Sequence, residues 1–254
     1  MGIPLQDKFF GCIAGSHIGS SMGAAVESWD YQDIEKKYGE LNQLVSHECY
    51  ENGWMRLPGT TEDGIERQKL MITAIIEKQD RVTAEDVKSI WIRDIKPISA
   101  GMVSERFEAV LLARAKAGIP ARDLGQYCDY AGLVSFARAC HPIGLINAGN
   151  EEWARRDIFE VGQLYQIDGS SGLQWALVTG VGIAAATKPG ATVDSVIDAI
   201  LKATVVTYCN KKYQKAAEAH YVSVKDKLEE MLDGKGLRLT KGEGDGAEKA
   251  TDKI

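Results

Sequence analysis

The spacing of apolar and polar residues divides most of the chain into helical segments. Apolar residues recur every three or four positions in these segments, and capping residues, proline or glycine stand at their ends. No alternating run longer than about five residues comes with hairpin signals, so the pattern does not indicate strands. We therefore predict an all-α fold, an orthogonal helical bundle with a buried central helix. The helices are expected over about residues 60–79, 83–95, 105–117, 150–165, 170–188, 192–206 and 211–234.

Candidate N-caps stand before several of these helices. Thr83 is followed three residues later by Asp86, which is close to a capping box. Asn150 precedes two glutamates, and Thr192 precedes an apolar-periodic run. These residues fix the expected starts of three helices.

Two of the predicted helices differ in how apolar they are. The stretch SSGLQWALVTGVGIAAAT, which ends at Lys188, is almost uncharged, and a helix that is apolar on all sides is buried. This helix is expected at the centre of the bundle. The helix over about 60–79 is amphipathic, with Ile65, Ile72 and Ile76 expected on one face.

A ladder of glycines marks the stretch FFGCIAGSHIGSSMGAAVE. Gly11, Gly15, Gly19 and Gly23 lie four residues apart, and no charged residue follows until Glu27. A membrane helix needs roughly 20 apolar residues, but this run is shorter and contains serines and a histidine. A phosphate-binding loop requires a preceding strand and the spacing G-x-G-x-x-G, which this stretch lacks. We therefore interpret it as a buried helix whose bare stripe lets another backbone approach.

The composition is that of a soluble globular protein and excludes a general nucleic-acid binder. The chain has 254 residues, of which 26% are charged, and its formal net charge is −6, whereas nucleic-acid binding needs a basic surface. Five widely spread cysteines without a C-x-x-C pair favour free thiols in the cytoplasm. One domain is expected over residues 1–236, followed by a Gly-rich, charged and disordered tail over 237–254.

The strongest local candidate for chemistry is the stretch PGTTEDG, which opens the helix over 60–79. Thr60 or Thr61 can cap this helix, and Glu62 and Asp63 then interact favourably with its dipole. The alternative is a divalent-cation site, because adjacent hydroxyl and carboxylate oxygens suit Mg²⁺. Three consecutive ligands cannot complete an octahedron, so a metal site would need further oxygens from elsewhere in the chain.

Two other residues are candidates for a functional site. Glu27 follows a long uncharged stretch; it either reaches the surface or faces a cleft, where partial burial would make it an acid or base. His141 lies in the stretch CHPIGLINAGN, where Gly144 allows close backbone approach. A histidine beside proline is either structural or a ligand contact, and the sequence leaves both open.

Three motifs in order resemble the ADP-ribosylglycohydrolase family. The stretch GCIAGSHIGSSMGAAVE resembles the family's opening helix, G-x-x-x-G-x-x-x-G-D-A-x-G-A-P-x-E. The stretch TEDG resembles its T-D-D-T/S segment, and HPIGLINAG resembles its P-I-G-L-x-x-A-G motif. The resemblance covers about residues 5–210, and GTTEDGIERQ is similar to a bacterial subgroup of the family.

The resemblance implies a function and a set of site residues. It implies an all-α hydrolase with two Mg²⁺ ions that cleaves a glycosidic bond of an ADP-ribosyl or related ribosyl substrate, free or protein-linked. Carried over by position, the metal ligands are Thr61, Glu62 and Asp63. The catalytic residues are Glu27 and Asp63. The expected substrate-binding residues are Ser20, His141 and Gly144.

The chain departs from the family pattern at three places. The acidic residue of G-D-A is Ser20, Glu62 is one methylene longer than the family's aspartate, and Gly64 replaces a hydroxyl ligand. A D-x-D-T motif near the C-terminus is not found. The chain alone therefore has fewer metal ligands than the family uses.

These departures leave competing functions open. The first is the Mg²⁺-dependent hydrolase. The second is an impaired or split family member that binds an ADP-ribose-like ligand or a complementing chain without turnover. A helical scaffold without a site would leave the charge-poor helix that ends at Glu27 without a purpose. We expect no membrane span, and the sequence does not fix whether the chain forms a homo-oligomer.

Overall fold

The computed structural model describes residues 2–48, 53–95, 106–128 and 135–208. The chain divides into two units, residues 1–204 and 205–254. Nearly all of the second unit lies outside the described residues, and so do the predicted helix over 211–234 and the predicted tail over 237–254. The single domain over 1–236 therefore stays a prediction.

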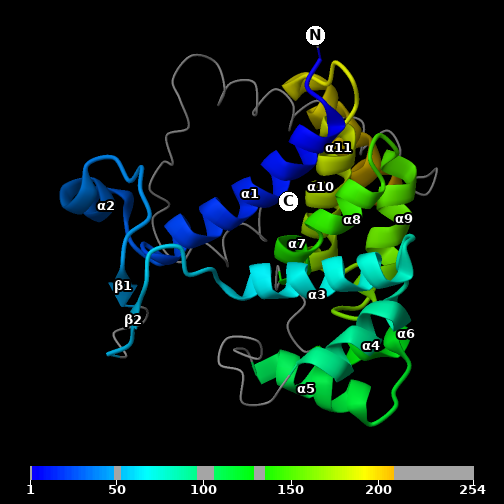
Figure 1. Cartoon of the computed structure of the whole chain (residues 1–254). Coiled ribbons are helices and arrows are strands. Elements are labelled where there is room, and N and C mark those ends of the chain that lie inside the picture. Colours follow the sequence, from blue (N-terminus) through cyan, green and yellow to red (C-terminus); the bar gives the residue numbers. More distant parts are fainter. Residues whose placement is uncertain (1, 49–52, 96–105, 129–134, 209–254) are drawn as a thin grey trace. The chain divides into compact units, whose positions relative to one another are not determined.

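Helices form nearly all of the regular structure in the described ranges, which confirms the all-α prediction (Figure 1). The strands described there are two residues long each and pair antiparallel, with His47 opposite Arg56. In chain order the elements are α1 (Leu5–Ala24), α2 (Tyr31–Tyr38), β1 (His47–Glu48), β2 (Met55–Arg56), α3 (Asp63–Lys78), α4 (Ala84–Asp94), α5 (Arg106–Lys116), α6 (Ala121–Leu124), the 3₁₀ turn η1 (Gly125–Tyr127), α7 (Ser135–Ala139), α8 (His141–Ile146), α9 (Glu151–Gly162), α10 (Ser171–Ala186) and α11 (Val193–Tyr208).

Helix α10 is the central helix that the sequence predicts. It packs against α7, α8 and α9 (Figure 1), and Leu173, Leu177 and Val181 on it are completely buried. Its glycines allow close packing, because a Cβ at Gly180 would lie 2.8 Å from Ile158 Cδ1 on α9. The uncharged pattern of this segment therefore reflects burial of most of the helix, while Trp175 on its remaining side is 57% exposed.

The predicted caps of three helices are present. Thr83 and Asp86 form a complete capping box at the start of α4. The side chain of Asn150 accepts a hydrogen bond from a backbone N–H in the first turn of α9. Before α11, the Thr192 hydroxyl accepts from the Ser195 N–H at 3.2 Å.

The start and the buried face of α3 differ from the prediction. The helix begins at Asp63 with Glu62 at the N-cap, and the Thr60 hydroxyl donates to the Leu57 carbonyl instead of capping the helix. The predicted isoleucines share one side of α3, but Ile65 is buried and Ile76 is 60% exposed, so this side is not buried along its whole length. The buried face carries Leu70, Met71 and Ala74 together with polar residues that belong to the site described below.

Helix α1 is not the buried helix that we expected. Only Ser21 and Ala24 are buried along it, whereas Phe10 is 76% exposed and Ile18 is 52% exposed. In the described part of the chain, no atom lies within 4 Å of a Cβ built at the four ladder glycines. No described group therefore packs closely against the ladder, and Gly19 and Gly23 line the pocket described below. None of the described helices combines the length and apolarity that crossing a bilayer requires.

Polar contacts at both ends hold α1 in place. Near its start, Lys8 Nζ donates to the carbonyls of Ala186 and Lys188, at the C-terminal end of α10, at 2.9 and 2.6 Å. Near its end, Ser20 and Ser21 form hydrogen bonds with the loop that leads into α3. These contacts, rather than apolar burial, set the position of α1.

An added methyl group at two glycines, one packed and one in open space, should change the free energy of unfolding in opposite directions. A Cβ at Gly144 would lie 2.7 Å from the Gly180 carbonyl oxygen and from Ile183 Cβ, so Gly144→Ala should lower the free energy of unfolding by about 1–3 kcal/mol. Gly15→Ala, in open space on α1, should raise it by up to about 1 kcal/mol through helix propensity. Urea denaturation of both variants measures the difference, and equal effects would contradict this account of α8 packing on α10.

Candidate active site

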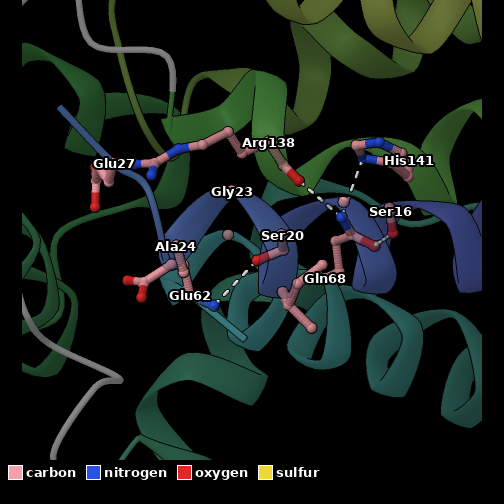
Figure 2. A pocket seen from close by; sticks show the side chains of 12 residues that line it. Ser16, Ser20, Gly23, Ala24, Glu27, Glu62, Gln68, Arg138 and His141 are labelled. Carbon is pink, nitrogen blue, oxygen red and sulfur yellow. Dashed lines mark hydrogen bonds between the residues drawn. The ribbon is translucent and has the colours of Figure 1, made fainter. Parts of the chain in front are cut away.

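A pocket of about 350 Å³ lies where α1, α3, α7 and α8 meet (Figure 2). It brings together the three sequence motifs, because the glycine helix, the TEDG segment and the HPIG segment each contribute lining residues. The lining residues are Ser16, Gly19, Ser20, Gly23, Ala24, Glu27, Glu62, Gly64, Ile65, Gln68, Arg138 and His141.

Two carboxylates line this pocket. Glu27 follows the end of α1 and is exposed, so the partial burial considered from the sequence is absent. The next residue, Ser28, has φ +66°, in the left-handed region, and turns the chain after Glu27. Glu62 stands at the N-cap of α3 and forms an ion pair with Arg56. Glu27 therefore lies at the exposed rim of the pocket, and Glu62 is held at the start of α3.

Ser20 and Ser21 join α1 to the segment that starts α3. The Ser20 hydroxyl accepts from the Glu62 backbone N–H at 3.0 Å, and the Ser21 hydroxyl donates to the Gly59 carbonyl at 3.1 Å. Ser20 thus satisfies a backbone donor at the α3 N-terminus, a task that the N-cap side chain does not perform. Ser20 also lines the pocket, so its predicted role in substrate binding stays a prediction that the geometry permits.

Asp63 lies behind the pocket wall, held by two arginines. Its Oδ2 is 2.8 Å from Arg67 Nη2, one turn along α3, and its Oδ1 accepts from Arg138 Nη1 at 2.9 Å. The Gly64 N–H also donates to Oδ1 at 2.7 Å. Burial raises the pKa of Asp63, but the charges of Arg67 and Arg138 and these hydrogen bonds outweigh it, so the pKa lies below its usual range.

Arg138 reaches Asp63 because residue 64 is glycine. A Cβ at Gly64 would lie 2.8 Å from Arg138 Cβ, so α7 and α3 touch at this point. The Arg138 side chain is 38% exposed and, in Figure 2, runs from the Gln68 end of the pocket toward Glu27. The family's Thr or Ser at this position would collide with it.

A chain of hydrogen bonds orients His141. Gln68 Nε2 donates to the Arg138 carbonyl at 2.8 Å and lies 3.2 Å from His141 Nδ1. The Gln68 Oε1 atom accepts from the Ser16 hydroxyl at 3.2 Å. Since the atom facing a carbonyl must be a donor, Gln68 presents its second N–H to Nδ1, which accepts it. The proton of the neutral ring is then on Nε2.

His141 is kept neutral by its surroundings. Burial is the main cause that lowers its pKa, the Arg138 carbonyl opposes this, and the nearby His17 adds to it. A neutral imidazole with Nδ1 accepting can donate a hydrogen bond to a ligand through Nε2. The predicted contact between His141 and a ligand is therefore compatible with its place in the pocket wall.

The Mg²⁺ that the resemblance implies does not fit the Thr61–Asp63 segment in this structure. Both Asp63 oxygens face guanidinium groups, and the Glu62 carboxylate is paired with Arg56. Within the described ranges, no three His, Cys, Asp or Glu side chains gather as metal ligands. A dication would have to approach beside Arg67 and Arg138, whose charges repel it. The assignment of Thr61, Glu62 and Asp63 as ligands stays a prediction without support from this geometry.

One predicted site residue does not line the pocket, and two residues that we did not predict do line it. Gly144 lies against α10 and is not among the lining residues, so its close approach serves helix packing. Arg138 and Gln68, which we did not single out, do line it. The spacing of Asp63 and Arg67, four residues apart on a helix, was the one local signal of the arginine cluster.

Neutral burial of His141 makes stability depend on pH. Its pKa is lowered by folding, so its contribution is complete above the unfolded value of about 6.5 and is lost as the pH falls through the folded value. His141→Asn should remove this component and leave a smaller loss of stability between pH 7.5 and pH 5. Urea denaturation at both pH values checks this; an unchanged loss in the variant would contradict it.

The comparisons with known proteins agree with the motifs in this pocket. The profile of a family described as ADP-ribosylglycohydrolase matches residues 1–249. A search of curated proteins found no match. Because the match spans nearly all of the 254 residues, the resemblance seen in the three motifs is confirmed. The chain belongs to the ADP-ribosylglycohydrolase family, whose members are hydrolases.

Proposed function

We propose that the chain hydrolyses the glycosidic bond at the anomeric carbon of an ADP-ribosyl or related ribosyl substrate. The observation that carries the proposal is the convergence of all three family motifs on one pocket with Glu27, Glu62 and His141 in its wall. The pocket's volume, about 350 Å³, suits a small ligand or part of one. Family membership supplies the reaction class, glycoside hydrolysis.

In this proposal Glu27 is the general base. An exposed carboxylate at the pocket rim can accept a proton from a water molecule as its oxygen attacks the anomeric carbon. The bond from that carbon to the leaving group breaks, and the leaving group departs with the electron pair.

His141 and Ser20 position the ribose in this proposal. The Nε2–H of a neutral His141 donates a hydrogen bond, and Gln68 keeps the ring in the required tautomer. The Ser20 hydroxyl is already an acceptor for the Glu62 N–H, so its own proton can be donated to a ligand oxygen. Two donors fixed by neighbouring groups favour one orientation of the sugar.

A second candidate function is binding without turnover. It is favoured by the ion pairs of Asp63 and Glu62, which occupy two carboxylates that the family resemblance assigns to metal. Such a chain would bind an ADP-ribose-like ligand or act with a complementing chain. The two candidates differ in whether the isolated chain releases product.

Product release by Glu27 variants tests the proposal. Wild-type protein is incubated with an ADP-ribosylated protein and with ADP-ribose derivatives, with MgCl₂ or EDTA, and released ADP-ribose or ribose is measured by chromatography. Glu27→Gln should lower the rate by about 10²–10⁴-fold, since it removes the general base. Glu35→Gln, an exposed glutamate on α2, is the matched control and should leave the rate unchanged.

The outcomes separate the two functions. Release that depends on Glu27 supports the hydrolase. Ligand binding by calorimetry with no release under either condition supports binding without turnover, and neither binding nor release rejects both.

A further inference from the structure

A cluster of one carboxylate and two guanidinium groups lies at the pocket, with Arg138 in the wall and Asp63 and Arg67 behind it. Asp63 Oδ1 faces Arg138 Nη1 at 2.9 Å, and Oδ2 faces Arg67 Nη2 at 2.8 Å and Arg138 Nη2 at 3.3 Å. Asp63 is 9% exposed and Arg67 is 4% exposed. With all three groups ionised, the cluster carries one net positive charge at a place where the family resemblance puts acidic metal ligands.

Covalent and steric constraints build this cluster into the chain. Arg67 follows Asp63 by four residues on α3, a spacing that brings the two side chains together on the helix surface. Arg138 comes from α7 and fits because Gly64 has no side chain, since a Cβ there would lie 2.8 Å from Arg138 Cβ. The glycine that removes the family's hydroxyl ligand is thus the residue that admits the arginine.

The two arginines neutralise the Asp63 carboxylate, as a bound cation would. Both carboxylate oxygens already have charge-assisted partners, and the strongest of these pairs are bidentate arginine contacts. A Mg²⁺ ion would have to displace Arg138 or share its carboxylate at close range with two like charges. Arg67 is only 4% exposed, so it stays beside the carboxylate in the interior.

We infer that Arg67 and Arg138 replace the divalent cation in this chain, and that Arg138 is the positive group that faces the ligand. Arg138 lines the pocket and is 38% exposed, whereas Arg67 is buried and balances Asp63. A planar guanidinium suits an anionic oxygen such as that of a phosphate. This inference rests on the proposed ribosyl ligand and adds that the ligand is phosphate-bearing and is bound without Mg²⁺.

Metal and ligand binding of the full chain test the inference separately. Free Mn²⁺, a spectroscopic substitute for Mg²⁺, is titrated with the protein and followed by electron paramagnetic resonance. We expect that the protein does not bind Mn²⁺ stoichiometrically at Asp63, so Asp63 causes no loss of the free-ion signal. The Kd for ADP-ribose, measured by calorimetry, should be the same within about twofold in MgCl₂ and in EDTA, because no cation takes part.

A substitution pair isolates Arg138. Arg138→Met should weaken ADP-ribose binding by about tenfold or more and reduce its salt dependence, since a charge-assisted contact is lost. It should change ribose binding much less. Arg156→Met, which removes an exposed arginine of α9, is the matched control and should leave the Kd unchanged. Thermal melting verifies that each variant folds. If a variant does not fold, the Mn²⁺ titration and the Kd for ADP-ribose of the wild type still test the inference.

Two results would overturn the inference. The first is stoichiometric Mn²⁺ binding by the wild type that Asp63→Asn abolishes. If Asp63→Asn leaves Mn²⁺ binding unchanged, the ion binds elsewhere, which agrees with the inference. The other is a Kd for ADP-ribose that rises tenfold or more when Mg²⁺ is removed. If the proposed function fails, neither ADP-ribose nor a ribosyl derivative binds in any condition. The Mn²⁺ titration still tests the cluster in that case, because it does not need the ligand.

Discussion

The ion pairs of Asp63 with Arg67 and Arg138 are the interaction on which the site depends. They join the first residue of α3 to α7 across 75 positions of sequence. A buried pair of this kind gains little net stability, but breaking it leaves an uncompensated charge, so it specifies one arrangement. His141 follows Arg138 by three residues, and the Arg138 carbonyl also accepts from Gln68. Arg138 therefore pairs with the carboxylate through its side chain and helps to align the pocket's histidine through its carbonyl and Gln68.

Glycines decide how closely the supporting helices approach. Gly144 sets α8 against α10, and Gly64 sets α3 against α7. Because α10 is the most deeply packed helix, α7 and α8 are fixed to the core, and the site residues that they carry inherit its rigidity. The ladder glycines of α1 make no such approach in the described part of the chain. Glycine content alone does not distinguish the two uses, since close approach depends on which residues lie opposite.

Local signals predicted local structure well. The capping box of Thr83 and Asp86 and the burial of α10 follow from residues that are neighbours in sequence. The environment of Asp63 was not predictable, because Arg138 belongs to a distant segment and only Gly64 admits it. The exposed side of α1 was missed for a related reason. Its long uncharged stretch after Lys8 indicated burial, but Lys8 and two serines hold this helix by polar contacts. The motifs located the pocket, but they left its charge balance undetermined.

The attachment of α1 at its two ends has a consequence for the dynamics of the pocket. A helix with little apolar burial opens locally at a lower free energy than a core helix such as α10. Glu27 and Ser20 are carried by this less stable element, whereas His141 and Arg138 are tied to the core. We therefore expect local opening of the pocket to occur at lower free energy on its α1 side than on the side that α7 and α8 form.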